Sequence, residues 1–316
     1  MAQHPQTASQ LEGKALSCGR LNAQRSHLKP ELFTIPFVNM PIHGYGLMVV
    51  VGFLLSVVLA RREARRDGLP EFVDGLGFTM LLSGIAGARL FHFIENYETE
   101  FADRSPLLIF AVWQGGLVFY GGALVGFAAA LLHLRLRRLP ISACLHSVFP
   151  FVPIAMGFGR IGCLFNGCCF GRPCKPSFLL GIIYPRSPDG GQWSAPFEHQ
   201  VSQGLLLPFE ESSLPVLPTQ LYEAGLDLLL AVVLWWLKRA GLPRRFGFPS
   251  LFAAYGTGRF LLEFLRADNL PTATGLTTSQ NVAIVTLAAA GVVLILFQLQ
   301  SLRQACLDPR RTGKKP

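Results

Sequence analysis

Residues 44–60 read GYGLMVVVGFLLSVVLA and contain no charged side chain. A helix needs roughly 17 to 25 predominantly apolar residues to cross a bilayer, and this stretch is long enough to do so. Six further apolar runs follow it, at residues 75–94, 107–134, 141–165, 219–237, 247–265 and 281–299. The sequence therefore predicts an all-α integral membrane protein with about seven transmembrane helices.

The composition agrees with a membrane protein. Of the 316 residues, 51% are hydrophobic and only 15% are charged, and the mean hydropathy of +0.40 is too high for an ordinary soluble domain. The net charge of +9 would suit nucleic acid only if the basic residues gathered on one soluble face. They occur instead in short groups between the apolar runs, so the membrane is the expected partner and nucleic acid is not.

The basic groups also predict the orientation of the chain. If every apolar run spans the membrane, RREARR at 61–66, RLRR at 135–138, KRAGLPRR at 238–245 and the basic C-terminal tail lie on one side. Cytoplasmic loops of membrane proteins collect Lys and Arg. We therefore expect the N-terminus outside and the C-terminus in the cytoplasm.

The chain divides into three predicted regions. Residues 1–40 are polar and lack the apolar core of a signal peptide, which indicates a mobile N-terminal extension. Residues 41–300 form the transmembrane domain, which includes residues 166–218, a segment rich in Pro, Gly and Ser that we expect to form a small extracytoplasmic cap. Residues 301–316 form a basic cytoplasmic tail.

Prolines interrupt the fourth apolar run. Pro150 and Pro153 both lie within residues 141–165. A transmembrane helix tolerates proline where neighbouring helices or water satisfy the freed carbonyl groups. This run is therefore expected to be an irregular helix that lines a cavity.

Three arginines lie within apolar runs, namely Arg89, Arg160 and Arg259. An ionisable side chain inside a membrane span is costly and therefore suggests a functional site. If the three converge on a cavity in the outer leaflet, they would bind an anion, most naturally a phosphate, because guanidinium binds phosphate in a bidentate manner. The structural alternative is pairing with carboxylates. Glu263 lies one helical turn from Arg259, and Glu223 is another acid in need of a cation.

Glycines concentrate in WQGGLVFYGGALVGF, residues 113–127. Such a segment approaches another helix or a lipid headgroup closely, and the composition alone favours helix packing. Tyr120 lies between two glycine pairs, where packing would prefer an apolar side chain. Its hydroxyl group therefore suggests a functional role.

Several short blocks occur in a characteristic order, namely YGLM at 45–48, GARL at 87–90, GGLVFYGG at 115–122, GRIGCLFNG and GRP within 159–173, PTQLYEA at 218–224 and YGTGRFLLEFLRAD at 255–268. Together they resemble the prolipoprotein diacylglyceryl transferase family over roughly residues 42–268. The resemblance implies transfer of the diacylglyceryl group of phosphatidylglycerol to the lipobox cysteine thiol of a preprolipoprotein, with release of glycerol 1-phosphate. It also implies a bacterial inner membrane protein whose partners are phosphatidylglycerol and preprolipoprotein signal peptides, without a cofactor.

The resemblance also assigns site residues. Arg160 and Arg259 are expected to clamp the phosphate and to stabilise the charge that develops as it departs. The other expected substrate-binding residues lie in or beside the same blocks and are Tyr45, Arg89, Asn166, Gly171, Gln220, Tyr222, Glu223, Tyr255 and Glu263.

The chain departs from the family pattern at positions that concern acid and base chemistry. The family usually has histidine at the positions of Tyr120 and Leu217, asparagine at that of Cys163 and glutamate at that of Cys168. A tyrosine acts as a base only if its pKa falls from about 10, as neighbouring arginines would cause. The alternative base is His43, because imidazole titrates near neutral pH. A third possibility is that the substrate thiol ionises beside the arginines without a base.

The sequence contains seven cysteines. Cys168, Cys169 and Cys174 lie in the expected cap, where a disulfide from Cys174 to Cys168 or Cys169 is permitted. Their spacing matches no standard zinc pattern and no histidine pair accompanies them, so no metal ligand is predicted. A redox role with Cys163 as the resolving thiol is the alternative.

Two other functions remain open at this point. The departures from the family pattern would also fit a divergent relative that keeps the phospholipid pocket but modifies another acceptor. These departures are Tyr120, Cys168 and Leu217. From another class, the chain would be a non-catalytic lipid-binding or redox membrane protein.

Overall fold

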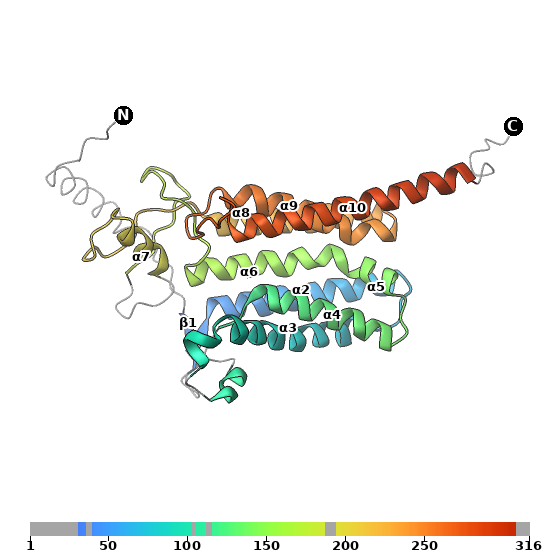
Figure 1. Cartoon of the computed structure of the whole chain (residues 1–316), viewed down its shortest axis with the longest axis horizontal. Helices are drawn as coiled ribbons and strands as arrows, with labels where there is room; N and C mark the ends of the chain where they lie inside the picture. Colours follow the sequence, from blue (N-terminus) through green and yellow to red (C-terminus); the bar gives the residue numbers. More distant parts are fainter. Residues whose placement is uncertain (1–30, 36–39, 103–104, 112–115, 187–193, 308–316) are drawn as a thin grey trace. The chain divides into compact units, whose positions relative to one another are not determined.

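The computed structural model describes residues 31–35, 40–102, 105–111, 116–186 and 194–307, and most of them are helical (Figure 1). The exception to the expected all-α fold is a small antiparallel sheet, in which β1 (Glu31–Ile35) pairs with β2 (Met40–His43). β1 contains aromatic and β-branched residues, which favour strands. Residues 31–35 of the predicted extension form β1, whereas residues 1–30 lie outside the described part of the chain, and a mobile extension over residues 1–40 stays a prediction.

Six helical segments are long and apolar enough to cross a membrane, which supports a multi-pass membrane protein. The remaining predicted span, the sixth along the chain at 247–265, corresponds to α9 (Gly247–Glu263), whose 17 residues make it shorter than the others. The six are α2 (Gly44–Arg66), α3 (Val73–Glu95), α4 (Phe119–Leu136), the segment Ile141–Asn166, α8 (Thr219–Arg239) and the part Thr278–Ser301 of α10 (Thr278–Leu307).

The fourth span is irregular, as its prolines predict. It consists of α5 (Ile141–Val148), the 3-10 turn η4 (Phe149–Phe151) and α6 (Val152–Asn166). Pro150 lies in the 3-10 turn, because proline lacks the N–H group that a continuous helix would use there.

The third span begins later than the apolar run 107–134 suggests. A short 3-10 helix, η2 (Pro106–Phe110), occupies its first residues, and α4 begins only at Phe119. Between them Gly116 has a φ of +67°, and a Cβ at this position would lie 2.2 Å from His92 Nε2. The first part of the predicted span is therefore wrong, because the backbone turns at a position that only glycine fits.

The chain forms two compact units. The first comprises the described residues within Met1–Phe53, Pro153–Val233 and Pro249–Pro316, and the second comprises those within Leu54–Val152 and Leu234–Phe248. In the second unit α3 packs against α4, and a Cβ on Gly122 would lie 2.9 Å from the carbonyl oxygen of Gly84. This contact confirms close helix packing as a role of the glycine-rich segment.

Glycines also join the helices of the first unit. A Cβ on Gly162 of α6 would lie 3.2 Å from the backbone of Tyr45 in α2, and one on Gly157 would lie 3.2 Å from a carbonyl oxygen of α8. In α9, Gly258 packs against α8 and Gly256 packs against α10. These close approaches bring the polar residues of α6, α8, α9 and α10 together.

The predicted cap segment, residues 166–218, folds as part of the first unit. It contains α7 (Ala195–Ser202) and a small core formed by Phe170, Tyr184 and Val216. The hydroxyl group of Tyr184 donates a hydrogen bond to the carbonyl oxygen of Leu164 in α6 at 3.2 Å. The segment is thereby attached to the end of a membrane-spanning helix, and its extracytoplasmic location stays a prediction.

Candidate functional site

Glu223 joins two of the arginines that the sequence singles out. It lies in α8 and is only 4% exposed. Arg160 Nε, from α6, lies 2.7 Å from Glu223 Oε2, and Arg259 Nη1, from α9, lies 3.0 Å from Glu223 Oε1. Arg160 and Arg259 therefore share one carboxylate, which is the structural alternative that the sequence left open for them. Glu223 has the cationic partners that the sequence suggested, and binding of an anion by the arginines stays a prediction.

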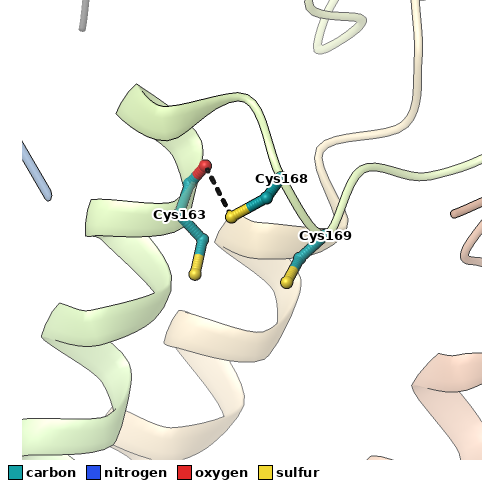
Figure 2. A group of neighbouring side chains, drawn as sticks. All are labelled: Cys163, Cys168 and Cys169. Atoms are coloured by element: carbon teal, nitrogen blue, oxygen red, sulfur yellow. Dashed lines mark hydrogen bonds between the residues drawn. The ribbon is translucent and has the colours of Figure 1, made fainter. Parts of the chain in front are cut away.

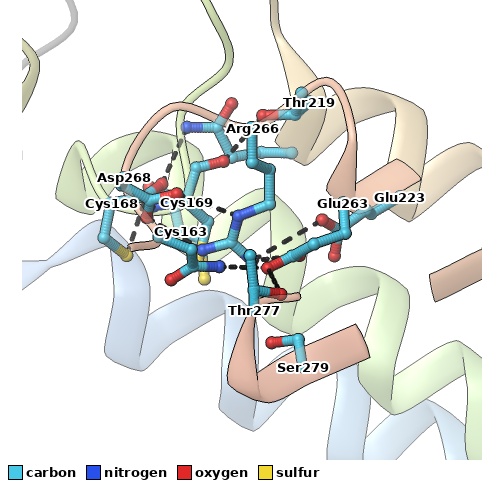
Figure 3. A network of polar contacts seen from close by, with 12 residues as sticks. Cys163, Cys168, Cys169, Thr219, Glu223, Glu263, Arg266, Asp268, Thr277 and Ser279 are labelled. Atoms are coloured by element: carbon cyan, nitrogen blue, oxygen red, sulfur yellow. Dashed lines mark hydrogen bonds and ion pairs between the residues drawn. The ribbon is translucent and has the colours of Figure 1, made fainter. Parts of the chain in front are cut away.

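A second group of charges continues this network (Figure 3). Arg259 Nη2 lies 2.7 Å from Glu263 Oε2, which confirms the predicted pairing one turn along the helix. Thr277 Oγ1 donates a hydrogen bond to Glu263 Oε1 at 2.8 Å. Arg266 donates to Asp268 through Nε at 2.9 Å and Nη2 at 2.8 Å, in bidentate geometry. Three helices and the loop after α9 thus contribute to one network.

The charges of this network balance within a largely buried site. The guanidinium groups of Arg160, Arg259 and Arg266 face the carboxylates of Glu223, Glu263 and Asp268. Burial alone would lower the pKa of Arg266, but its hydrogen bond to Asp268 and the negative charges of Cys169, Asp268 and Glu263 together raise it. A phosphate is able to replace a carboxylate here, because both anions accept bidentate hydrogen bonds from guanidinium.

Three thiols form a cluster at the end of α6 (Figure 2). Cys163 is in the last turn of α6, Cys168 and Cys169 are in the following loop, and their sulfur atoms all lie within 4.8 Å of one another. Arg160 Nη1 donates to the sulfur of Cys169 at 3.6 Å, and Asn166 Nδ2 donates to that of Cys168 at 3.6 Å. Hydrogen bonds from the other two thiols, together with the charges of Arg266 and Arg160, lower the pKa of Cys169.

The disulfide from Cys174 that the sequence permits is not formed in the described part of the chain. The Cys174 side chain instead donates a weak hydrogen bond to the carbonyl oxygen of Pro215 at 3.4 Å. This contact directs the Cys174 side chain toward Pro215, so the predicted disulfide is not found in this structure.

Several expected substrate-binding residues shape the loop that carries the thiols. Gln220 is 1% exposed and donates from Nε2 to the carbonyl oxygen of Cys168 at 2.8 Å. Gly171 donates its N–H to the carbonyl oxygen of Leu217, and a Cβ at this position would lie 2.7 Å from the same oxygen. Tyr255 forms a hydrogen bond with Arg160. Among the remaining expected residues, Tyr45 packs on Gly162, and Tyr222 is half-buried in the first turn of α8.

His43 belongs to the first unit as well. It is exposed at the end of β2 and immediately precedes Gly44. A Cβ on Gly44 would lie 2.8 Å from the ring of Phe165, which is adjacent to Asn166 at the end of α6. The backbone that follows His43 thus approaches the end of α6, while the His43 side chain is exposed.

Arg89 and Tyr120 belong to the second unit. Arg89 is 5% exposed and donates to the carbonyl oxygens of Leu108 at 2.6 Å, Ile109 at 3.1 Å and Gly116 at 3.2 Å, so it organises the segment before α4. Tyr120 is 44% exposed, and its hydroxyl group has no hydrogen-bond partner within the ranges that the structure describes. Their convergence with Arg160 stays a prediction.

Comparison with known proteins shows the family of this chain. A sequence model described as prolipoprotein diacylglyceryl transferase matches residues 30–297, most of the chain. The chain belongs to this family. A phosphatidylglycerol–prolipoprotein diacylglyceryl transferase of Xanthomonas campestris is 34% identical over 284 residues, which cover 85% of this chain and 90% of the relative. The enzyme of the same name from Clostridium tetani is 28% identical over 278 residues, covering 88% of this chain and 100% of the relative.

Membership of the diacylglyceryl transferase family confirms the resemblance deduced from the sequence blocks. Together with the six long apolar helices, it supports a multi-pass protein of the inner membrane. Sequence reasoning missed Arg266, Asp268 and Thr277 as members of the network. The segment LRAD, which ends the last block, held a signal for the first two. Thr277 precedes α10 and carried no comparable signal.

Proposed function

We propose that this chain transfers the diacylglyceryl group of phosphatidylglycerol to the lipobox cysteine of preprolipoproteins and releases glycerol 1-phosphate. The observation that carries the proposal is the buried contact of Arg160 and Arg259 with one carboxylate, Glu223. The names of the relatives support the same substrates.

The proposed reaction requires positive charge beside the departing phosphate, and the arginines of this network would provide it. The acceptor sulfur forms a bond to the glyceryl carbon, the bond from that carbon to the phosphate oxygen breaks, and the electron pair leaves with the phosphate. Positioned guanidinium groups stabilise the charge that develops on that oxygen, and they do so more strongly in a site that excludes water. In this proposal the phosphate takes hydrogen bonds from Arg160 and Arg259, and Asn166, Tyr45 and Tyr255 complete the lipid site.

The thiol proton requires an acceptor, and we propose His43 rather than Tyr120. His43 is exposed and directly precedes Gly44, which approaches Phe165 at the end of α6, in the same unit as the two arginines. A general base contributes about 10²–10⁴-fold, so His43→Asn should lower the transfer rate at least about a hundredfold. Tyr120→Phe should leave the rate unchanged, and the reverse pattern in these two variants would identify Tyr120 as the base.

The assay that tests the function follows the mass of a lipobox peptide. Purified protein in detergent micelles that contain phosphatidylglycerol should add one diacylglyceryl unit to the peptide, and a peptide with serine in place of the cysteine should remain unmodified. If folded protein that binds the lipid leaves the cysteine peptide unchanged, the chain uses another acceptor and the proposal fails.

We also propose seven spans, with α9 crossing the membrane, the N-terminus outside, the cap segment extracytoplasmic and the C-terminus in the cytoplasm. The basic groups at 61–66, 135–138 and 238–245 support this orientation. Reporter enzymes that are active on only one side of the membrane should locate residues 138 and 316 in the cytoplasm and residue 186 outside. A reporter after residue 316 that is active outside would require an even number of spans.

A further inference from the structure

The three thiols at the end of α6 have no role in the proposed transfer. The sulfur atoms of Cys163, Cys168 and Cys169 lie within 4.8 Å of one another and face a common space (Figure 2). Cysteine in a core behaves as a small apolar residue, but these side chains are only partly buried. They also adjoin Arg160 and Asn166, which an inert apolar cluster would avoid.

The backbone that carries two of these thiols is fixed from outside the loop. Thr219 Oγ1 donates to the carbonyl oxygen of Cys169 at 2.7 Å, and Gln220 Nε2 donates to that of Cys168 at 2.8 Å. The N–H group of Cys169 donates to Asp268 Oδ2 at 3.0 Å. These hydrogen bonds hold the backbone of the loop that carries the thiols.

Cys169 has an unusual backbone conformation. Its φ is +60°, in the left-handed region, where a residue with a Cβ costs of order 1–3 kcal/mol. A conformation of this kind persists where the surroundings enforce it, and here Thr219 and Asp268 do so. In this backbone conformation, the sulfur atom of Cys169 lies close to those of Cys163 and Cys168.

We propose that Cys163, Cys168 and Cys169 together bind one thiophilic d10 cation, either Zn²⁺ or Cu⁺. Zinc–sulfur bonds of about 2.3 Å place tetrahedral ligands about 3.8 Å apart, so the sulfur atoms would close by about 1 Å. Binding forms three metal–sulfur bonds and releases the thiol protons to solvent, with no change in oxidation state.

The ligands and their surroundings determine this class of ion. Thiolate sulfur selects Zn²⁺ and Cu⁺, whereas Mg²⁺ and Ca²⁺ require oxygen ligands. N–H groups of Arg160 and Asn166 point at two of the sulfur atoms, and such contacts orient metal ligands and offset their negative charge. Three protein ligands suit a trigonal Cu⁺ ion, or a Zn²⁺ ion that takes a fourth ligand from solvent.

The test uses the reduced full-length protein in detergent, titrated with Zn²⁺ or, without oxygen, with Cu⁺ against a coloured competing chelator. We expect one ion to bind per chain. The ion with the lower dissociation constant in its own titration, Zn²⁺ or Cu⁺, is then the class of ion that the site binds. The affinity for the ion should fall more than about a hundredfold in each of Cys163→Ser, Cys168→Ser and Cys169→Ser. This loss is larger than the usual effect of removing a residue that only orients a metal ligand. Cys174→Ser and Cys144→Ser are matched controls, because neither cysteine forms a disulfide or belongs to the cluster.

A second measurement needs no substitution. Cd²⁺ added to the unsubstituted protein should produce the ultraviolet absorption of sulfur-to-metal charge transfer at one equivalent. The proposal is overturned if protein with its thiols shown to be reduced binds no ion, or if binding survives in all three cluster variants. A disulfide between two of the three thiols in freshly isolated protein would equally overturn it. Neither measurement involves lipid transfer, so its result is independent of the proposed function.

Discussion

Arg160→Ala is expected to lower the rate of diacylglyceryl transfer by about 10²–10³-fold, the usual cost of removing one positioned donor from a developing anion. Arg160 is partly buried, with its side chain 19% exposed, and its Nε lies 2.7 Å from Glu223. A guanidinium fixed in this way needs little rearrangement when the phosphate departs. The loss should therefore appear mainly in kcat, because the interaction strengthens as the charge develops.

Two further variants separate charge from geometry. Arg160→Lys keeps the positive charge but loses the bidentate fork, so it should recover only part of the rate. Arg172→Ala removes an exposed arginine from the cap segment and should leave the rate unchanged. Rates are measured as mass gained by the lipobox peptide over time, at several concentrations of phosphatidylglycerol. An Arg160→Ala protein that is folded and transfers at the original rate would exclude Arg160 from the phosphate site.

The membrane helices were predictable because hydropathy is a local property of the sequence. The apolar run 107–134 misled the prediction, because hydropathy does not distinguish a helix from an apolar loop. There the chain turns at Gly116, where contacts with Arg89 and His92 determine the conformation. Those contacts join residues far apart in the sequence, so no local pattern shows them.

The sequence predicted those site residues that are charged although their neighbours in the chain are apolar. Arg160 and Arg259 stand out because charge is rare in apolar runs, and Glu263 follows from helical spacing. The thiol cluster was not predictable, because it depends on the left-handed conformation of Cys169 and on a hydrogen bond to Asp268. The spacing of the cysteines alone suggested a disulfide that the described structure does not contain.

Glu223 should be the residue on which the stability of the site depends most. Its carboxylate is 4% exposed and lies within 3.0 Å of a nitrogen of Arg160 and of Arg259. Glu223→Gln keeps the shape but removes the charge, so two buried guanidinium groups repel each other without a shared counterion. Breaking a buried ion pair on one side typically costs 3–5 kcal/mol, and we expect a loss of about this size in the free energy of unfolding.

The measurement is denaturant-induced unfolding in detergent, with Glu71→Gln as the matched control. Glu71 pairs with Arg65 at 2.8 Å, but the two side chains are 80% and 62% exposed, so its loss should cost less than about 1 kcal/mol. Glu223→Gln combined with Arg259→Met should be more stable than the sum of the two single effects predicts, because the second substitution removes one of the uncompensated charges. Equal unfolding midpoints for Glu223→Gln and Glu71→Gln would show that the buried carboxylate does not hold the arginines together. In that case the arginines would be held by the helices alone, and a phosphate would bind to them without having to displace Glu223.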